Sequence, residues 1–289
     1  MAARELRVIW GVVGVTAVVT AVTYARLPAD DLYNVSGSGL AGGLGRALVA
    51  LNFPGALIAL GVLGVIAQFF EGRTRIAALV AGVSCAIVVV PGVVTQRDLD
   101  AKWVNAAPAL GVAIALALSF VAVVPATRRR QGDGVRLGLV VALTFVAVPW
   151  IAAALGFYLH ASPIFQTDAI VSYHGNAPHP AVHHGLHHGL FGLMLVVTAL
   201  LLSRIPNRVG LFLALMLAYG IANIANDVWL EQVAERGWTS WAIPSSTEPA
   251  LTWTWLAVLL ATPLIWLAWF RGRAMTTIPA DGLFRQFET

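Results

Sequence analysis

All seven histidines of this protein lie between positions 160 and 188, and five of them fall in the motif HPAVHHGLHHGLFGL. On a helix that turns by about 100° per residue, His183 and His187 form one pair a turn apart. His184 and His188 form a second such pair on nearly the same face. Two imidazoles four residues apart on one helix are a common arrangement for holding a metal ion. The spacing therefore predicts a metal site at the start of an apolar segment.

Two further histidines extend the predicted set of ligands. His179 precedes His183 by four residues, with Pro180 suited to the first turn of a helix, and His160 ends the preceding apolar segment. We therefore expect the metal ligands among His160, His179, His183, His184, His187 and His188. Such a site suits a divalent transition metal, namely zinc, iron, manganese or copper. A haem iron held between His160 and the cluster is the alternative cofactor.

The histidine cluster also has two explanations that need no metal. Imidazole titrates near neutral pH, so the cluster is compatible with proton handling or pH sensing. Histidines at a membrane interface also serve packing and hydrogen bonding alone. Against this last explanation, ionisable groups in a membrane-embedded setting usually have a functional reason.

Carboxylates that could complete a metal site end the next apolar segment, in the stretch NIANDVWLEQVAERGW. Asn223, Asp227, Glu231 and Glu235 are spaced by four and therefore share one helical stripe. A carboxylate inside an apolar span costs roughly 2.5–3.5 kcal/mol, so Asp227 needs a partner. We predict Asp227 and Glu231 as catalytic carboxylates that bind the metal, orient its imidazoles or act as a general base. Glu235, beside Arg236, is interpreted as a solvated helix end.

The composition identifies the setting of this chemistry. The chain is 58% hydrophobic and 11% charged, whereas soluble domains carry about 25% charged residues. This composition indicates an integral membrane protein. The pI of about 9.7 does not require a nucleic-acid partner, because basic residues in cytoplasmic loops give the same value. The single cysteine, Cys85, rules out an intrachain disulfide framework and a thiolate metal cluster.

Stretches of about 20 mostly apolar residues are long enough for a helix to cross a bilayer. About eight stretches meet this condition. They predict an all-α, polytopic membrane protein in which residues 1–289 form one helical-bundle domain. The predicted spans cover residues 7–26, 47–70, 75–95, 104–126, 135–159, 183–204, 208–230 and 250–270.

The connections between these spans alternate in charge. One set is rich in arginine and includes Arg4, Arg73 and Arg75, while the other set holds most of the acidic residues. The positive-inside rule therefore places both termini in the cytoplasm and the histidine-rich connection on the outer side. Only Lys102 among the 18 basic residues is a lysine, a bias typical of GC-rich bacterial genomes. We expect a multi-pass protein of a bacterial plasma membrane.

These observations favour a metal-dependent membrane enzyme, either a hydrolase or an oxidoreductase. Its site would lie at the outer face, and its substrate would be lipid-like or another hydrophobic small molecule reaching the site from the bilayer. Two alternatives stay open: a metal or haem handling protein, such as a transporter or an oxidase assembly factor, and an accessory subunit of a membrane complex. The expected partners are membrane lipids and that substrate, with no nucleic acid, and the pattern makes no prediction of oligomeric state.

Overall fold

The structure analysed is a computed structural model of the chain. It describes residues 4–26, 39–90, 93, 101–122, 133–155, 157, 170–174, 177–180, 185–205, 208–246 and 252–270. For residues 39–41, 133, 170–174, 177–180, 187 and 188 the description covers the backbone.

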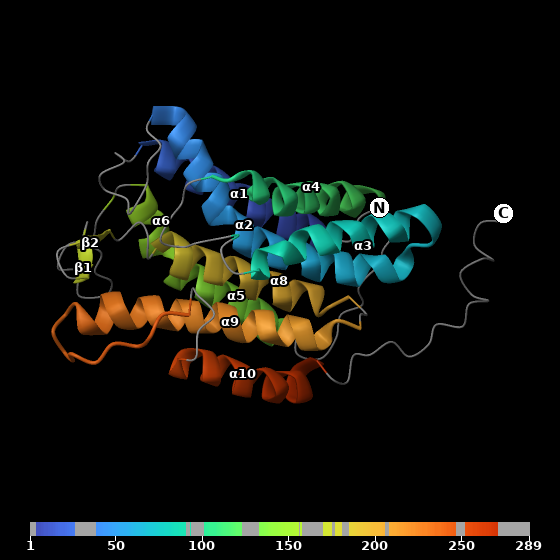
Figure 1. Ribbon diagram of the computed structural model, residues 1–289. Helices are drawn as coiled ribbons and strands as arrows, with labels where there is room; N and C mark the ends of the chain where they lie inside the picture. The colour runs from blue at the N-terminus through green and yellow to red at the C-terminus, as the bar shows by residue number, and fades with distance from the viewer. Residues whose placement is uncertain are drawn as a thin grey trace.

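The described chain is mainly helical (Figure 1). Its α-helices are α1 (Arg4–Arg26), α2 (Gly39–Ile66), α3 (Gly72–Ala86), α4 (Ala106–Val121), α5 (Asp133–Val146), α6 (Val148–Ala154), α8 (Phe191–Leu202), α9 (Gly210–Trp229) and α10 (Trp253–Ile265). Three short 3-10 turns adjoin them: η2 (Ala67–Phe69), η3 (Ile87–Val89) and η4 (Trp103–Asn105). Three π-helical segments follow: η5 (Gly185–Leu190), η6 (Leu230–Ala234) and η7 (Trp266–Phe270).

Six helices of the described chain are long and apolar enough to cross a membrane, as expected for a multi-pass membrane protein. They cover Arg4–Arg26, Gly42–Phe69, Gly72–Val89, Trp103–Val121, Gly210–Ala234 and Trp253–Phe270. A seventh span results if α5 and α6 form one helix with a 40° bend. Pro149 is the second residue of α6, just after this bend, and a proline there removes a backbone hydrogen bond to the preceding turn.

The predicted span over 183–204 differs from the others. Within its described part, the π-helix η5 precedes α8, which has only 12 residues. Every residue of α8 except Leu201 is buried by neighbouring helices, among them α1, α2, α5 and α9. The apolar run therefore predicted a helix correctly here. The side chains of this helix are buried by other helices of the protein, and α8 alone is shorter than a membrane span.

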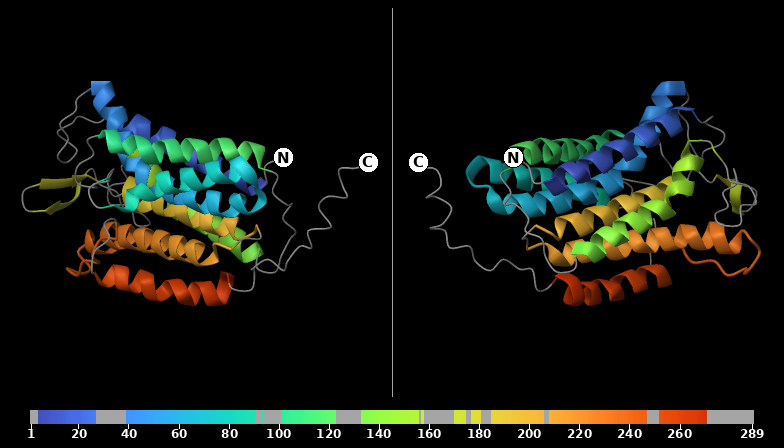
Figure 2. Two further views of the ribbon diagram at one scale, coloured as in Figure 1. Left: turned by 45° about the vertical axis from the view of Figure 1, so that its right-hand side comes forward. Right: turned by 180° about the vertical axis from the view of Figure 1, so that it is seen from behind.

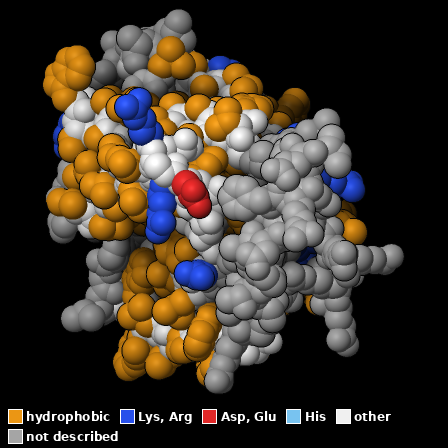
Figure 3. All heavy atoms as spheres, turned by 90° about the vertical axis from the view of Figure 1, so that its right-hand side faces the viewer, with side chains coloured by type: hydrophobic (Ala, Val, Ile, Leu, Met, Phe, Trp, Pro, Cys, Tyr) orange, Lys and Arg blue, Asp and Glu red, His pale blue; other side chains and the backbone are white. Residues whose placement is uncertain are grey.

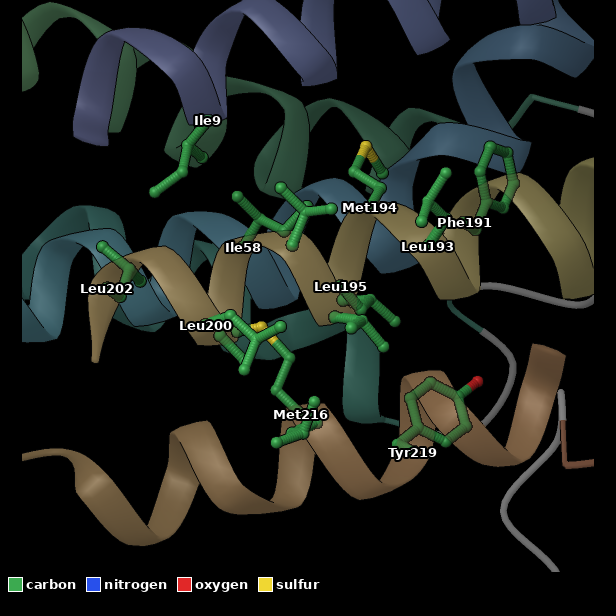
Figure 4. Close-up of a cluster of buried hydrophobic side chains, with 14 of the residues drawn as sticks. Ile9, Ile58, Phe191, Leu193, Met194, Leu195, Leu200, Leu202, Met216 and Tyr219 are labelled. Carbon is green, nitrogen blue, oxygen red and sulfur yellow. The ribbon is translucent and has the colours of Figure 1, made fainter. Parts of the chain in front are cut away.

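Around α8 the bundle is packed by large aliphatic side chains from several helices. Figure 4 shows Ile9 of α1, Ile58 of α2 and Met194 of α8 in this cluster, and Leu200 of α8 pointing toward Met216 of α9. All five of these side chains are at most 2% exposed. The cluster makes α8 the central helix, against which the others are positioned.

The helices α8 and α9 run antiparallel and cross at two glycines. A Cβ atom on Gly192 would lie 2.9 Å from the carbonyl oxygen of Gly220, and one on Gly220 would lie 2.8 Å from that of Gly192. The same Gly192 Cβ would lie 3.2 Å from the Cβ of Asn223. Only residues without a side chain allow the two backbones to approach this closely, so the pair fixes the register between α8 and α9.

The two ends of the bundle differ in their connections (Figures 1 and 2). The start of α1 and the end of η7 lie at one end, together with the tight junction between η2 and α3. At the opposite end lie the end of α9 and an antiparallel hairpin of β1 (Ile170–His174) and β2 (Ala177–Pro180), in which Ser172 pairs with His179. On which side of the membrane each end lies stays a prediction.

This hairpin corrects one expectation. The sequence placed His179 and Pro180 at the start of the helix that carries the later histidines, whereas both lie in β2. The described part of that helix begins at Gly185. Proline suits the first turn of a helix, but it is also accepted at the edge of a two-stranded sheet, so its presence alone did not distinguish the two.

Candidate functional site

Two carboxylates are buried near the end of α9. The side chain of Asp227 is fully buried and that of Glu231, in the adjoining segment η6, is 2% exposed. Their carboxyl groups lie close enough to interact electrostatically, so they form a pair rather than two separate charges. By contrast Glu235, four residues further along, is exposed, as expected for a solvated helix end.

A ladder of polar groups leads to this pair along the same face of α9. Tyr219, Asn223, Asp227 and Glu231 follow one another at intervals of four residues, and all four are buried. The amide of Asn223 donates a hydrogen bond of 2.9 Å to the carbonyl oxygen of Tyr219. The Tyr219 ring stacks on Trp255 of α10 at a centroid distance of 5.2 Å, which closes the inner end of the ladder with aromatic surface.

The segment after η6 folds back over this face and is hydrogen-bonded to it. The buried hydroxyl of Ser246 donates to Oδ1 of Asn223 at 3.1 Å, and Nδ2 of Asn226 donates to the carbonyl oxygen of Ile243 at 2.8 Å. Sequence reasoning missed both Asn226 and Ser246. The only available signal was that Asn226 stands directly before Asp227 in an otherwise apolar run.

The helical turns that carry His187 and His188 lie against the carboxylate end of α9. Both histidines are part of η5, which precedes α8 and contacts α9. The helices α8 and α9 are antiparallel and cross at Gly192. The residues of η5, which come before Gly192, and Asp227, which comes after Asn223, therefore lie toward the same end of the bundle. The side chains of His187 and His188 lie outside the described residues, so their contacts are not assigned.

The remaining predicted ligands are placed only in part. His179 lies in β2, in the hairpin at the same end of the bundle as Glu231 (Figure 1). His160, His183 and His184 lie outside the described residues. Among the side chains that are described, no group of three or more His, Cys, Asp or Glu is arranged to hold a metal ion. That description includes Asp227 and Glu231 but none of the seven histidines.

Both helices depart from α-helical geometry at this end. The segment η5, with His187 and His188, is a π-helix, and so is η6, with Glu231. A π-helical turn is wider than an α-helical one and redirects the side chains that follow it, and such turns recur at functional sites. The i, i+4 pairing of His183 with His187 and of His184 with His188 assumed α-helical turns, so it does not carry over to η5 unchanged.

Exposed tryptophans follow η6 in the chain, and another begins α10. Trp238, Trp241 and Trp253 are 71%, 62% and 78% exposed, and the indole of Trp229 donates a hydrogen bond of 2.9 Å to the carbonyl oxygen of Trp241. Such amphipathic rings gather where the hydrocarbon of a bilayer meets the headgroups. Trp238 and Trp241, which follow η6, fit the position where a spanning helix ends at a membrane surface.

No protein family, curated protein or solved structure matches this chain, so its functional interpretation depends on the residues and geometry described above.

Proposed function

We propose that this protein is a metal-dependent integral membrane enzyme that acts on a lipid-like or other hydrophobic substrate. Its metal would be held by histidines of the cluster together with Asp227 and Glu231. The observation that carries the proposal is the burial of these two carboxylates toward the end of α9 and in the adjoining η6, together with the contact of α9 with the histidine-bearing segment η5.

The chemistry of the buried pair supports a cation. Two carboxylates held together away from water repel each other when both are ionised, and a divalent metal offsets that repulsion. Mixed imidazole and carboxylate ligands suit zinc, iron, manganese or copper. A metal bound there would polarise a substrate group or activate water, and the carboxylate not engaged as a ligand could accept a proton.

The position of the pair supports a substrate that comes from the membrane. Glu231 precedes the exposed Trp238 and Trp241 by seven and ten residues, and exposed tryptophans are expected at the level of bilayer headgroups. A lipid presents its polar, reactive groups at this same depth. A molecule that diffuses laterally in the bilayer would therefore reach the site without leaving the membrane.

We further propose a bacterial plasma-membrane protein with about eight crossings, in which both termini are cytoplasmic and the site faces outward. The end of the bundle opposite to Asp227 supports this orientation, because the exposed side chains there include Arg4, Arg7, Arg73 and Arg208. The eight crossings comprise the six long helices, the bent pair of α5 and α6, and η5 continued by α8.

The test is metal analysis of the purified full-length protein. We expect about one or two equivalents of a transition metal in the natural sequence, and loss of that metal in Asp227→Asn/Glu231→Gln and in His183→Ala/His187→Ala. The matched control is Glu235→Gln, which neutralises an exposed carboxylate on the same helical stripe and should keep its metal. An optical spectrum of each sample distinguishes haem, through its Soret band, from other forms of bound iron.

Two results would count against the proposal. One is a natural protein that folds fully without metal and does not take it up when zinc, iron, manganese or copper is supplied. The other is equal metal content in all variants, which would place the metal at another site.

A further inference from the structure

A groove lies between α1 and α4 at the end of the bundle opposite to Asp227, so it is separate from the proposed enzyme site. Its volume is about 290 Å³. The residues that line it include Leu6, Arg7 and Gly11 of α1 and Leu116, Ser119 and Phe120 of α4.

The base of the groove is firmly built. The indole Nε1 of Trp10, which also lines the groove, donates a hydrogen bond of 2.9 Å to the hydroxyl of Ser119. That hydroxyl in turn donates to the carbonyl oxygen of Ala115 at 2.7 Å. Leu6 beside them is fully buried. The hydrogen bond from Trp10 to Ser119 connects α1 with α4, so the base of the groove has a fixed shape.

The open side of the groove faces outward from the helix bundle, toward the lipid that surrounds a membrane protein. Phe120 at its edge is 71% exposed, and Val15, further along α1, is 66% exposed. A Cβ atom on Gly11 would meet nothing within 4 Å, so the space over this residue is open. In a bilayer, acyl chains surround a spanning helix, so this apolar groove is open to them.

The mouth of the groove carries positive charge. Arg7 lines it and is exposed, and Arg4, three residues earlier on the same face of α1, is also exposed. Figure 3 shows this end of the molecule, where basic side chains, with acidic atoms beside them, stand among hydrophobic ones. Because Arg7 lies one turn from the start of a spanning helix, it is at the level of lipid phosphates, and each such cation attracts anionic headgroups.

We propose that this groove binds one anionic phospholipid. Its phosphate and headgroup contact Arg7, and one acyl chain lies over Gly11 between α1 and α4. The apolar walls recognise the chain, and the charge at the mouth distinguishes an anionic headgroup from a zwitterionic one. A soluble phosphate compound lacks the chain that fills the groove and is not the expected ligand.

Native mass spectrometry of the full-length protein in detergent tests this directly. The probes are dioleoylphosphatidylglycerol, dioleoylphosphatidylcholine and glycerol 3-phosphate. We expect one retained phosphatidylglycerol, bound about fivefold more tightly than phosphatidylcholine, and no retained glycerol 3-phosphate. Arg7→Gln should remove the preference for the anionic lipid, and Gly11→Leu should fill the channel and lower retention of both lipids.

Two matched controls separate the groove from general effects. Gly14→Leu adds the same side chain to the next open position on α1, outside the groove, and Arg73→Gln removes an exposed arginine at the same end. Both should bind phosphatidylglycerol like the natural protein. Equal binding by Gly11→Leu and Gly14→Leu, or equal retention of the two lipids by the natural protein, would overturn the proposal. Retention of glycerol 3-phosphate comparable to that of phosphatidylglycerol would also overturn it.

Discussion

At the scale of single residues, burying ionised Asp227 and Glu231 costs free energy of folding. Their helix is apolar enough to cross a membrane, yet both carboxyl groups are buried in its last turns. Placing ionised groups in such surroundings opposes folding unless a cation or a set of hydrogen bonds stabilises them. A bound metal would therefore contribute to the stability of the folded protein as well as to any reaction.

Removal of metal should affect the thermal stability of variants at the buried and the exposed carboxylates differently. A ligand present at about 100 times its dissociation constant stabilises the folded state by roughly 2.7 kcal/mol, and a chelator removes this contribution. We expect a chelator to lower the thermal midpoint of the natural protein and of Glu235→Gln, and to leave that of Asp227→Asn unchanged. Equal responses in all three proteins would contradict a metal at Asp227.

The hydroxyl of Ser246 supports a second prediction at this scale. It donates to the buried amide oxygen of Asn223, and a buried acceptor that loses its donor costs about 1–3 kcal/mol. Ser246→Ala should therefore lower the free energy of unfolding by about this amount in a denaturant titration. Ser240→Ala, at an exposed serine of the same segment, should change it by less than about 0.5 kcal/mol.

At the scale of helices, the crossing of α8 and α9 determines how close the two functional elements come. Gly192 and Gly220 bring the backbones together, and the histidine-bearing segment η5 is the direct continuation of α8. Any separation of the helices at the glycines moves η5 away from the end of α9. The carboxylates and the histidine-bearing turn are thus positioned by two residues that have no side chains.

An alanine at the crossing should reveal this dependence. In Gly220→Ala the new Cβ would lie 2.8 Å from the carbonyl oxygen of Gly192, so the helices must part, at a cost of about 1–3 kcal/mol. We expect a lower thermal midpoint and weaker metal binding. Gly138→Ala in α5, where a Cβ meets nothing within 4 Å, should be neutral or slightly stabilising. Equal behaviour of the two variants would argue against the crossing as a positioning device.

Helix patterns explain which elements were predictable. Long apolar runs gave correct positions for α1, α2, α4 and α9, because run length and hydrophobicity are properties of the local sequence. The π-helical turns of η5 and η6 follow no period that a 3.6-residue repeat detects. The contact of Ser246 with Asn223 joins residues 23 positions apart, so no local pattern indicated it.

At the scale of the whole molecule, the two ends of the bundle have different characters. One end carries exposed arginines, including Arg4, Arg7 and Arg73, and the other carries exposed tryptophans and the carboxylate pair. A membrane protein with this asymmetry is expected to insert in one orientation. The lipid groove and the candidate metal site then lie in opposite leaflets.

Cysteine labelling tests this orientation with little background. The native Cys85 is fully buried, so a membrane-impermeant maleimide should not reach it. We expect Glu235→Cys to be labelled on intact cells and Arg73→Cys only after the membrane is opened. The reverse pattern would place the candidate site in the cytoplasm and contradict the proposed orientation.

The burial of α8 has a consequence for how this protein is made. Nearly every one of its side chains is covered by another helix, so α8 is stabilised by contacts within the protein rather than by contact with lipid. The neighbour that packs most closely on it, α9, is synthesised after it. A ribosome that has completed α8 has therefore produced a helix that its main partner does not yet cover. We expect chains that stop before α9 to be recognised and degraded, and those that continue to become stable only as α9 arrives.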